Sequence, residues 1–408
     1  MGNPFMFKLK TIMSRCLYLT WGVYMLTLLC GCQHDTKFLN GIGRAKEILL
    51  IDRHEAHNLA TYIEWIDKMP NTEFILEIDN YKPNAQSEAL LNLMQCKRNV
   101  KILKSIHHHD KSLEEYSILK QTTVGGGTSA MCAVDAFCIT VQSCCGREAI
   151  YTSSKFNSSD LLTASGISKM NTVSDSLLIP GGNMLTVNDH TFIGVSSYPK
   201  LSKYLNPDQP ADTNAVIKKL KARYGISDCV TIDFIGILDT IHQPTLYHLD
   251  LMLTCTGKRP SDGKYLFFIP QIESTDGTLS RFNKEVRDSL DVFALQAREI
   301  FDKRFNGMDT IIRVPAFTDC DGRFIYSPVN GIVDERCGKP VYYFPEPDIR
   351  AQPSMDRDRI RKYSCAAMNI FKEYLGKDNV IPLRVPGYMI RSHSQSLHCT
   401  MSVLKRGN

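Results

Sequence analysis

Residues 212–234 read DTNAVIKKLKARYGISDCVTIDF, and they contain one complete unit of a helix followed by a strand. Asp212 belongs to the residue types that cap helix N-termini, because its carboxylate can accept hydrogen bonds from otherwise unpaired backbone N–H groups. An amphipathic pattern over 213–224 predicts the helix, and Gly225 stands where a left-handed residue would end it. The β-rich run 229–234 predicts a strand directly afterwards.

The same unit is expected four more times along the chain. Its helix and strand are predicted at 59–69 and 74–78, at 85–96 and 100–103, at 290–305 and 310–314, and at 359–375 and 380–385. Recurrence of one supersecondary unit indicates a repeat architecture that can close around an axis, whereas a doubly wound α/β sheet is the alternative. The segment 111–200 differs, because it is rich in short predicted strands and turns.

The composition is that of a globular protein. Of 408 residues, 43% are hydrophobic and 22% charged, which excludes a disordered, collagen-like or coiled-coil chain. The net charge is +5, and Lys8, Lys10 and Arg15 of the first 31 residues supply three of these charges. The remainder is therefore close to neutral, and nucleic acid is not an expected partner.

The N-terminus has the features of an export signal. Basic residues precede the apolar run 16–29, which is too short for a comfortable membrane span. The run ends in Leu29-Cys30-Gly31-Cys32, which resembles a bacterial lipobox. A buried apolar helix is the alternative.

This pattern predicts a division of the chain into three parts. Residues 1–31 are expected to be a lipoprotein signal peptide, residues 32–43 a short linker after a lipidated Cys32, and residues 44–408 a single domain. The protein would then be an exported bacterial lipoprotein, held at the outer membrane or periplasmic face by its lipid anchor alone.

The cysteines outside the signal are odd in number, so complete disulfide pairing is impossible and an unpaired thiol is a candidate nucleophile. No pair of Cys-x-x-Cys elements appears, so a structural zinc site is not indicated. His107, His108, His109 and Asp110 could bind a metal, but consecutive histidines on an irregular segment point in different directions. A solvated loop is the preferred interpretation, and no metal site is predicted.

Three short motifs carry residues that could perform chemistry. His248 and Asp250 would point to the same side of a strand and into one cleft, unless they form an exposed pair on an edge strand. Cys399 follows His398 in a polar segment and is either a reactive thiol or a buried inert one. Gly181-Gly182-Asn183 would let the backbone pass close to a ligand, with a plain turn as the alternative.

The order and spacing of these motifs, together with the five repeated units, resemble the guanidino-group-modifying enzymes. This superfamily includes agmatine deiminases, peptidylarginine deiminases and amidinotransferases, and the resemblance covers residues 48–403. It implies an α/β fold of the pentein type, a five-bladed ββαβ propeller around a central active site. It further implies that Cys399 is the nucleophile, that His248 is the general acid and base, and that Asp250 binds the guanidinium group.

The resemblance extends to five more positions. Asp135 falls where the family has a second aspartate that grips the guanidinium. Gly182 and Asn183 match the family's Gly-Gly-Asn segment and are expected to bind substrate. Asn330, in Ser327-Pro328-Val329-Asn330, is expected to do so at the mouth of the site. His398 matches a histidine that often precedes the cysteine in the agmatine deiminase branch.

The expected reaction is hydrolysis of a guanidinium group. Two carboxylates can fix the planar cation, a thiolate can attack its central carbon, and a histidine can move protons to the leaving amine and from water. No cofactor is expected, and the substrate would be agmatine, arginine or a peptidyl arginine. An amidinotransferase is one alternative. A guanidinium-binding lipoprotein without turnover is another, because Val134 replaces an arginine of the family motif and Ser394 to Leu397 replace its glycine-rich run.

Overall fold

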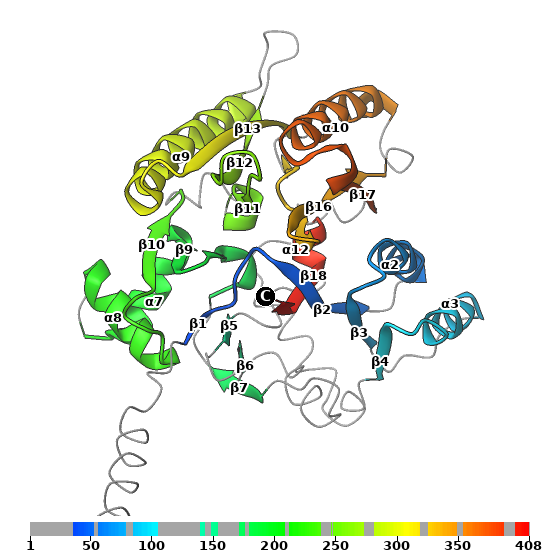
Figure 1. Cartoon of the computed structure of the whole chain (residues 1–408), viewed down its shortest axis with the longest axis horizontal. Helices are drawn as coiled ribbons and strands as arrows, with labels where there is room; N and C mark the ends of the chain where they lie inside the picture. Colours follow the sequence, from blue (N-terminus) through cyan, green and yellow to red (C-terminus); the bar gives the residue numbers. More distant parts are fainter. Residues whose placement is uncertain are drawn as a thin grey trace, which may run out of the picture.

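The computed structural model describes residues 36–52, 56–78, 85–104, 139–142, 148–153, 171–175, 179–208, 212–237, 246, 248–272, 281–318, 325–348, 354–386 and 396–407. Within these residues the strands form five separate sheets. Figure 1 shows the sheets arranged around a common centre, with the long helices on the outside. The chain is therefore a mixed α/β protein, as expected.

The first sheet contains β18 (Met401–Gly407), β2 (Arg44–Asp52), β3 (Glu73–Ile78) and β4 (Val100–Lys104), in that order. The second contains β1 (Lys37–Phe38), β5 (Ile139–Gln142), β6 (Glu148–Ser153) and β7 (Asn171–Asp175). The third contains β8 (Met184–Val187), β9 (His190–Gly194) and β10 (Thr231–Ile235). The fourth contains β11 (Thr254–Lys258), β12 (Tyr265–Ile272), β13 (Asp309–Thr318) and β14 (Ile325–Tyr326). The fifth contains β15 (Ile332–Arg336), β16 (Lys339–Pro347) and β17 (Val380–Val385).

The helices are α2 (Ala56–Lys68), α3 (Ala85–Gln95), α7 (Tyr198–Leu205), α8 (Thr213–Tyr224), α9 (Arg281–Phe305), α10 (Ser354–Leu375) and α12 (Leu397–Thr400). Short 3-10 turns are η2 (Gly181–Asn183), η3 (Val195–Ser197), η5 (Leu249–Leu251) and η7 (Lys377–Asn379). The stretch quoted first forms α8 and β10 as expected. Asp212 accepts a hydrogen bond from the Ala215 N–H at 2.7 Å, and Gly225 ends α8 at φ 63°.

All five sheets share one pairing pattern. Each contains an antiparallel pair followed by a parallel pair, namely β18–β2–β3, β5–β6–β7, β8–β9–β10, β11–β12–β13 and β15–β16–β17. A helix connects the parallel strands in four of them, through α2, α7 with α8, α9 and α10. The first sheet pairs the last strand of the described chain, β18, with the second strand, β2.

The predicted helix and strand units are present, but they do not each build a sheet. The unit at 85–103 forms α3 and β4, and β4 pairs with β3, so it extends the first sheet. The remaining sheet comes from β5, β6 and β7, within the segment 111–200 that the sequence analysis set apart. These strands are only four to six residues long, which leaves little periodicity to detect.

The described part of the expected linker packs against the third sheet and its helices. Phe38 is fully buried and its ring lies 6.4 Å from that of Tyr224. The Gly41 N–H donates to the Thr186 carbonyl at 2.6 Å, and a Cβ at Gly41 would lie 2.7 Å from Leu185 Cδ1. The chain is therefore already fixed before β2 begins.

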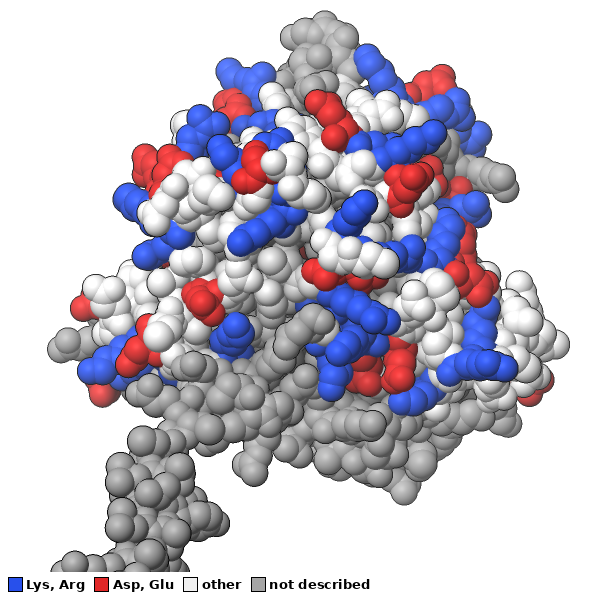
Figure 2. Space-filling model, in the orientation of Figure 1, with Lys and Arg blue, Asp and Glu red and all other residues white. Residues whose placement is uncertain are grey.

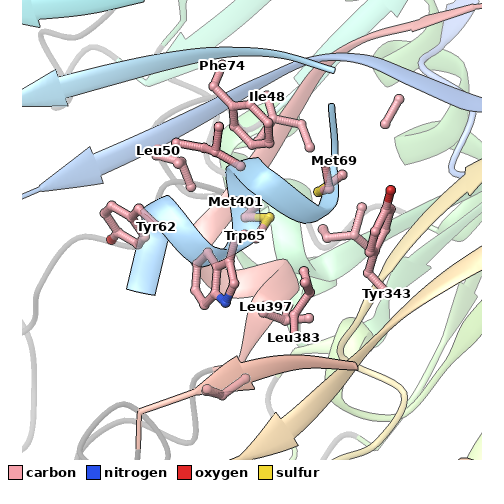
Figure 3. Packing of buried hydrophobic residues seen from close by; sticks show 14 of the residues in the cluster. Ile48, Leu50, Tyr62, Trp65, Met69, Phe74, Tyr343, Leu383, Leu397 and Met401 are labelled. Carbon is pink, nitrogen blue, oxygen red and sulfur yellow. The ribbon is translucent and has the colours of Figure 1, made fainter. Parts of the chain in front are cut away.

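One large hydrophobic core lies under α2 and reaches the centre of the molecule. Figure 3 shows Trp65 of α2 close to Leu397 of α12 and Met401 of β18, and all three side chains are fully buried. The Trp65 indole N–H donates to the Arg384 carbonyl at 2.8 Å, which joins α2 to β17 of the next sheet. Burial of such side chains stabilises a fold by about 1.5–3 kcal/mol each. This core therefore fixes the position of α12, because Leu397 of α12 is one of its members.

None of the helices among the described residues is long and apolar enough to cross a membrane.

Candidate functional site

The motif segments occupy the same place in different sheets. Four sheets have a motif just before the strand that pairs only in the antiparallel direction: η2 before β8, η5 before β11, Ser327–Asn330 before β15, and α12 before β18. Equivalent ends of equivalent strands meet on one side of a repeat fold, so these segments converge although they are far apart in sequence. Figure 1 places α12 next to the centre of the molecule.

Asp250, His398 and Cys399 form the centre of the site. The Asp250 carboxylate oxygen Oδ2 lies 2.9 Å from His398 Nδ1 and 3.6 Å from Cys399 Sγ. Asp250 and Cys399 are 7% and 4% exposed, whereas the His398 side chain is 30% exposed. The contact between Asp250 Oδ2 and His398 Nδ1 has the length of a hydrogen bond. Cys399 forms no disulfide with another described cysteine.

The expectation that His248 and Asp250 lie on a strand is wrong. Residues 249–251 form the 3-10 turn η5, and His248 is the extended residue before it, with φ −109° and ψ 141°. The two side chains therefore do not follow the alternation of a strand. Asp250 enters the cluster from within the turn, and His248 is buried at its start, 8% exposed.

Gly182 allows η2 to pass directly against the carboxylate. A Cβ at this position would lie 2.7 Å from Asp250 Oδ2 and 3.0 Å from Asp250 Cγ. Only glycine leaves room for that approach, because real Cβ atoms essentially never come so close. The sequence predicted that the backbone at Gly181-Gly182-Asn183 passes close to a ligand. In the structure the backbone at Gly182 passes close to the Asp250 carboxylate.

Asn183 fixes the turn that carries Asp250. Its Oδ1 accepts a hydrogen bond from the Leu249 N–H at 3.0 Å, while its Nδ2 donates to Ser196 Oγ at 2.9 Å and to Ser197 Oγ at 2.7 Å. These bonds give the side chain a positioning role, and its expected contact with substrate stays a prediction. A Cβ at Gly194 would overlap Asn183 Oδ1, so the site also needs this glycine. The sequence analysis missed both serines, because nothing local marks them.

Asn330 joins the two reactive segments. Its side chain is fully buried and donates through Nδ2 to the Asp250 carbonyl at 3.2 Å. Its backbone carbonyl accepts from the His398 N–H at 3.2 Å. Ser327 adds a second bridge, because its Oγ donates to the Leu251 carbonyl at 2.7 Å. The segment before β15 therefore ties η5 to α12 and sets the separation of carboxylate and thiol.

A buried tyrosine that the sequence analysis did not single out supports this segment. The Tyr342 hydroxyl donates to the Pro328 carbonyl at 2.7 Å and accepts from the Gly331 N–H at 2.9 Å. Complete burial raises the pKa of Tyr342 well above its usual value, so the phenol stays protonated as a donor. Its signal in the sequence is indistinguishable from that of any apolar strand residue.

One buried oxygen of the Asp250 carboxylate, Oδ1, has no hydrogen-bond partner among the described residues. A buried polar atom without a hydrogen bond costs free energy, and a buried charged one costs more. The Asp250 carboxylate thus uses one oxygen within the protein and leaves the other for a donor from outside. A planar cation with several N–H groups meets that requirement.

Some predicted residues lie outside the described residues, namely Cys32, His107, His108, His109, Asp110 and Asp135. Within the part that is described, no three or more histidine, cysteine, aspartate or glutamate side chains are grouped as metal ligands would be.

Comparison with known proteins places this fold. The sequence matches no protein-family model. It also matches no curated protein. An X-ray structure of a proposed agmatine deiminase matches with a TM-score of 0.54 and 11% identity, over 92% of this chain and 97% of that one. SxtG, an amidinotransferase from Microseira wollei in the saxitoxin biosynthetic pathway, matches with a TM-score of 0.45 and 10% identity, over 92% and 98% of the two chains.

The first of these matches establishes a common fold. The resemblance to guanidino-group-modifying enzymes that the motifs indicated is thereby confirmed at the level of the fold. An identity of 11% does not carry an activity or a substrate from one protein to the other.

Proposed function

We propose that this protein is a cysteine-dependent hydrolase of a guanidinium group, a deiminase. The observation that carries the proposal is the Asp250 carboxylate, which is buried, has one oxygen 3.6 Å from the Cys399 sulfur, and has its other oxygen without a hydrogen-bond partner among the described residues. A guanidinium group bound there would present its central carbon to the sulfur. The fold shared with a proposed agmatine deiminase supports the same chemistry.

The five sheets are, in this proposal, the blades of a closed ββαβ propeller. Their common pairing pattern and their arrangement around one centre support it. In this proposal Asp135 is the equivalent of Asp250 in the second sheet. It precedes the start of β5 by four positions in sequence, just as Asp250 precedes the start of β11 by four. We propose that Asp135 is the second carboxylate that holds the guanidinium plane.

The proposed reaction proceeds in two steps. The Cys399 thiolate adds to the central carbon, and His248 protonates the departing nitrogen. Ammonia is then released, and a covalent thiouronium intermediate remains on Cys399. His248 then takes a proton from water, which adds to the same carbon and expels the thiolate. The products are ammonia and a ureido compound. Agmatine, arginine and peptidyl arginine share the head group, and nucleic acid is not among the proposed ligands.

The test is a colorimetric ureido assay on the purified protein under reducing conditions, with agmatine, arginine and an arginine-containing peptide. Colour with one substrate that disappears in Cys399→Ala supports the hydrolase and names its substrate class. Loss of a covalent nucleophile costs on the order of 10⁶ in rate, so any residual product at wild-type rate refutes the assignment. An amidinotransferase would instead release ornithine or putrescine only after addition of an acceptor amine, without ureido product. Binding of agmatine without any product would identify a silent binding protein.

We also propose that the chain is exported and anchored through Cys32, as an outer-membrane or periplasmic-face lipoprotein of a bacterium. The apolar run 16–29 and the lipobox-like residues 29–32 support this. Growth with radiolabelled palmitate should label the wild type and leave Cys32→Ser unlabelled. A label on both proteins, or on neither, contradicts the proposal.

A further inference from the structure

The described chain begins against the third sheet and its helices. The Thr36 carbonyl accepts a hydrogen bond from the Ser227 N–H at 2.9 Å, and Thr36 forms a bridge with Ile226. Phe38 is buried in the core cluster that also contains Tyr224. Cys32 precedes Thr36 by only four positions. An extended chain of that length spans at most about 14 Å, so an anchor at Cys32 would keep this part of the protein close to the lipid.

The two helices at this place carry only basic charges. α7 and α8 contain six lysines and arginines and no acidic residue: Lys200, Lys203, Lys218, Lys219, Lys221 and Arg223. By contrast, α2, α3, α9 and α10 each contain aspartate or glutamate. Figure 2 shows basic and acidic side chains interspersed over the displayed face of the described residues. The pair α7 and α8 therefore differs in charge from α2, α3, α9 and α10.

The hydrogen bonds of Lys219 and Lys221 do not cancel the charges of these two side chains. Lys219 donates to the Leu205 carbonyl and the Asn206 side chain, and Lys221 donates to the Asp228 carbonyl at 3.1 Å. All of these acceptors are neutral. Among the described residues no ion pair reaches Lys200, Lys203 or Lys218, all of which are exposed.

Acidic residues do flank the helices, in the connecting segments. They are Asp208, Asp212 and Asp228. Asp212 is bound to the backbone as the cap of α8. The helix pair with its flanks still has twice as many basic as acidic residues, and the helices themselves present only positive charge.

We propose that the exposed face of α7 and α8 docks on an anionic lipid bilayer. The inference rests on the lipid anchor at Cys32 proposed above. A lipid chain alone would tether the protein without orienting it. Lysines and arginines within a Debye length of a negatively charged leaflet are attracted to it, and several on one face select one orientation. The anchor and the basic face coincide because the chain joins the fold beside α8.

Two native cysteines can report this orientation. Cys229 is exposed just after α8, and Cys365 is exposed on α10. Figure 1 shows α8 and α10 on opposite sides of the ring of sheets. A bulky polyethylene-glycol maleimide should therefore lose access to Cys229, but not to Cys365, when the α7–α8 face lies on the membrane.

The full lipid-carrying protein is reconstituted into vesicles of phosphatidylcholine alone or of phosphatidylcholine with phosphatidylglycerol, and labelled sites are identified by mass spectrometry. In anionic vesicles the labelling ratio of Cys229 to Cys365 should fall about tenfold, and high salt should restore it. Lys218→Gln with Lys219→Gln and Lys221→Gln should also restore it. The matched control on α10, Arg357→Gln with Arg361→Gln and Lys362→Gln, should not.

An equal labelling ratio in both kinds of vesicle overturns the docking surface while leaving the anchor intact. If mass spectrometry finds no lipid on the wild type, the anchor proposal fails separately. Cosedimentation of the same unlipidated protein with the two vesicle types then decides: binding to anionic vesicles that the α8 substitutions abolish supports the face, and equal or absent binding overturns it.

Discussion

Asp250 and Asp334 are both buried aspartates near the middle of the molecule, and their surroundings differ in one respect. Asp334 is 5% exposed, and its Oδ1 accepts hydrogen bonds from the N–H groups of Ala45 and Glu335, both at 2.8 Å. Its Oδ2 lies 3.5 Å from the Tyr343 hydroxyl. Asp250 has comparable burial but leaves Oδ1 unpartnered among the described residues.

The comparison distinguishes Asp334, whose hydrogen bonds stabilise the fold, from Asp250, which belongs to the proposed binding site. Asp334 connects β15 to β2, and its charge lies near Arg406, which donates to the Gly43 and Val333 carbonyls. Burial lowers the pKa of Arg406 to about 10, and the negative charge of Asp334 opposes that shift. Both carboxylate oxygens of Asp334 therefore have partners within the protein. At Asp250 the described residues bond one carboxylate oxygen, and the other oxygen is the one that would bind the proposed substrate.

The largest expected effect comes from removing the charge of Asp250. In Asp250→Asn the rate constant kcat/KM should fall by about a thousandfold or more, because the guanidinium loses its ionic partner. The melting temperature should stay close to that of the wild type, because the amide can still bond with His398. Enzyme kinetics and thermal unfolding, measured on the same preparation, check both parts. An Asp250→Asn variant with a much lower melting temperature but an unchanged kcat/KM would contradict the distinction between the two aspartates.

Asp334→Ala should show the opposite behaviour. It leaves the N–H groups of Ala45 and Glu335 unpaired and Arg406 without its nearby negative charge, so the free energy of unfolding should fall by about 3–5 kcal/mol. Activity per folded molecule should not change. Urea unfolding with active-site titration measures the two quantities. Asp334→Asn keeps an acceptor at Oδ1 and is the control, with a smaller loss.

Gly182→Ala tests whether the position of the Asp250 carboxylate matters apart from its charge. The new Cβ would lie 2.7 Å from Oδ2 and must displace it, which should lower kcat about a hundredfold. Gly225→Ala is the matched control, because a Cβ at Gly225 meets nothing within 4 Å. At φ 63° that variant should lose about 1 kcal/mol of stability and retain its kcat. Equal kinetic losses in both variants would contradict a positioning effect.

The smallest effect is expected at the second buried thiol, which extends the comparison to sulfur. Burial raises the pKa of Cys255 from 9.0 to about 12, and the thiol is enclosed by the core of the fourth sheet. Cys255→Ala should therefore leave activity unchanged, and iodoacetamide at pH 9 should spare Cys255 in the native protein. Between pH 9 and 12 the unfolded thiol ionises first, so this group lowers stability as pH rises. Rapid native labelling of Cys255 would show that burial does not decide reactivity here.

The sequence predicted the helices and strands better than it predicted their association. Capping and glycine signals located α8 correctly, because they act within a few residues. The geometry of η5 was predicted wrongly, because the Leu249 N–H bonds to Asn183, which lies 66 positions away. No local pattern contains that bond. The sheet of β5, β6 and β7 was missed for a similar reason, since strands this short are defined by their partners.

The site shows the same limit. Motif order was sufficient to select Asp250 and Cys399, which the structure brings within 3.6 Å. It did not distinguish residues that would touch a substrate from residues that hold them. The Asn183 side chain accepts a hydrogen bond from the Leu249 N–H, and the Asn330 side chain donates one to the Asp250 carbonyl. These bonds to the backbone of η5 exist only when three sheets are assembled.

The pairing of β18 with β2 also has a kinetic consequence. α12 leads directly into β18, and β18 finds its partner at the other end of the described chain. The thiol therefore reaches Asp250 only when the last strand has closed the first sheet, and contacts of such high sequence separation form late in folding. A chain cut before residue 401 would lack β18 and its pairing with β2, which follow directly on α12. If the proposed function holds, activity would therefore depend on complete synthesis and complete folding.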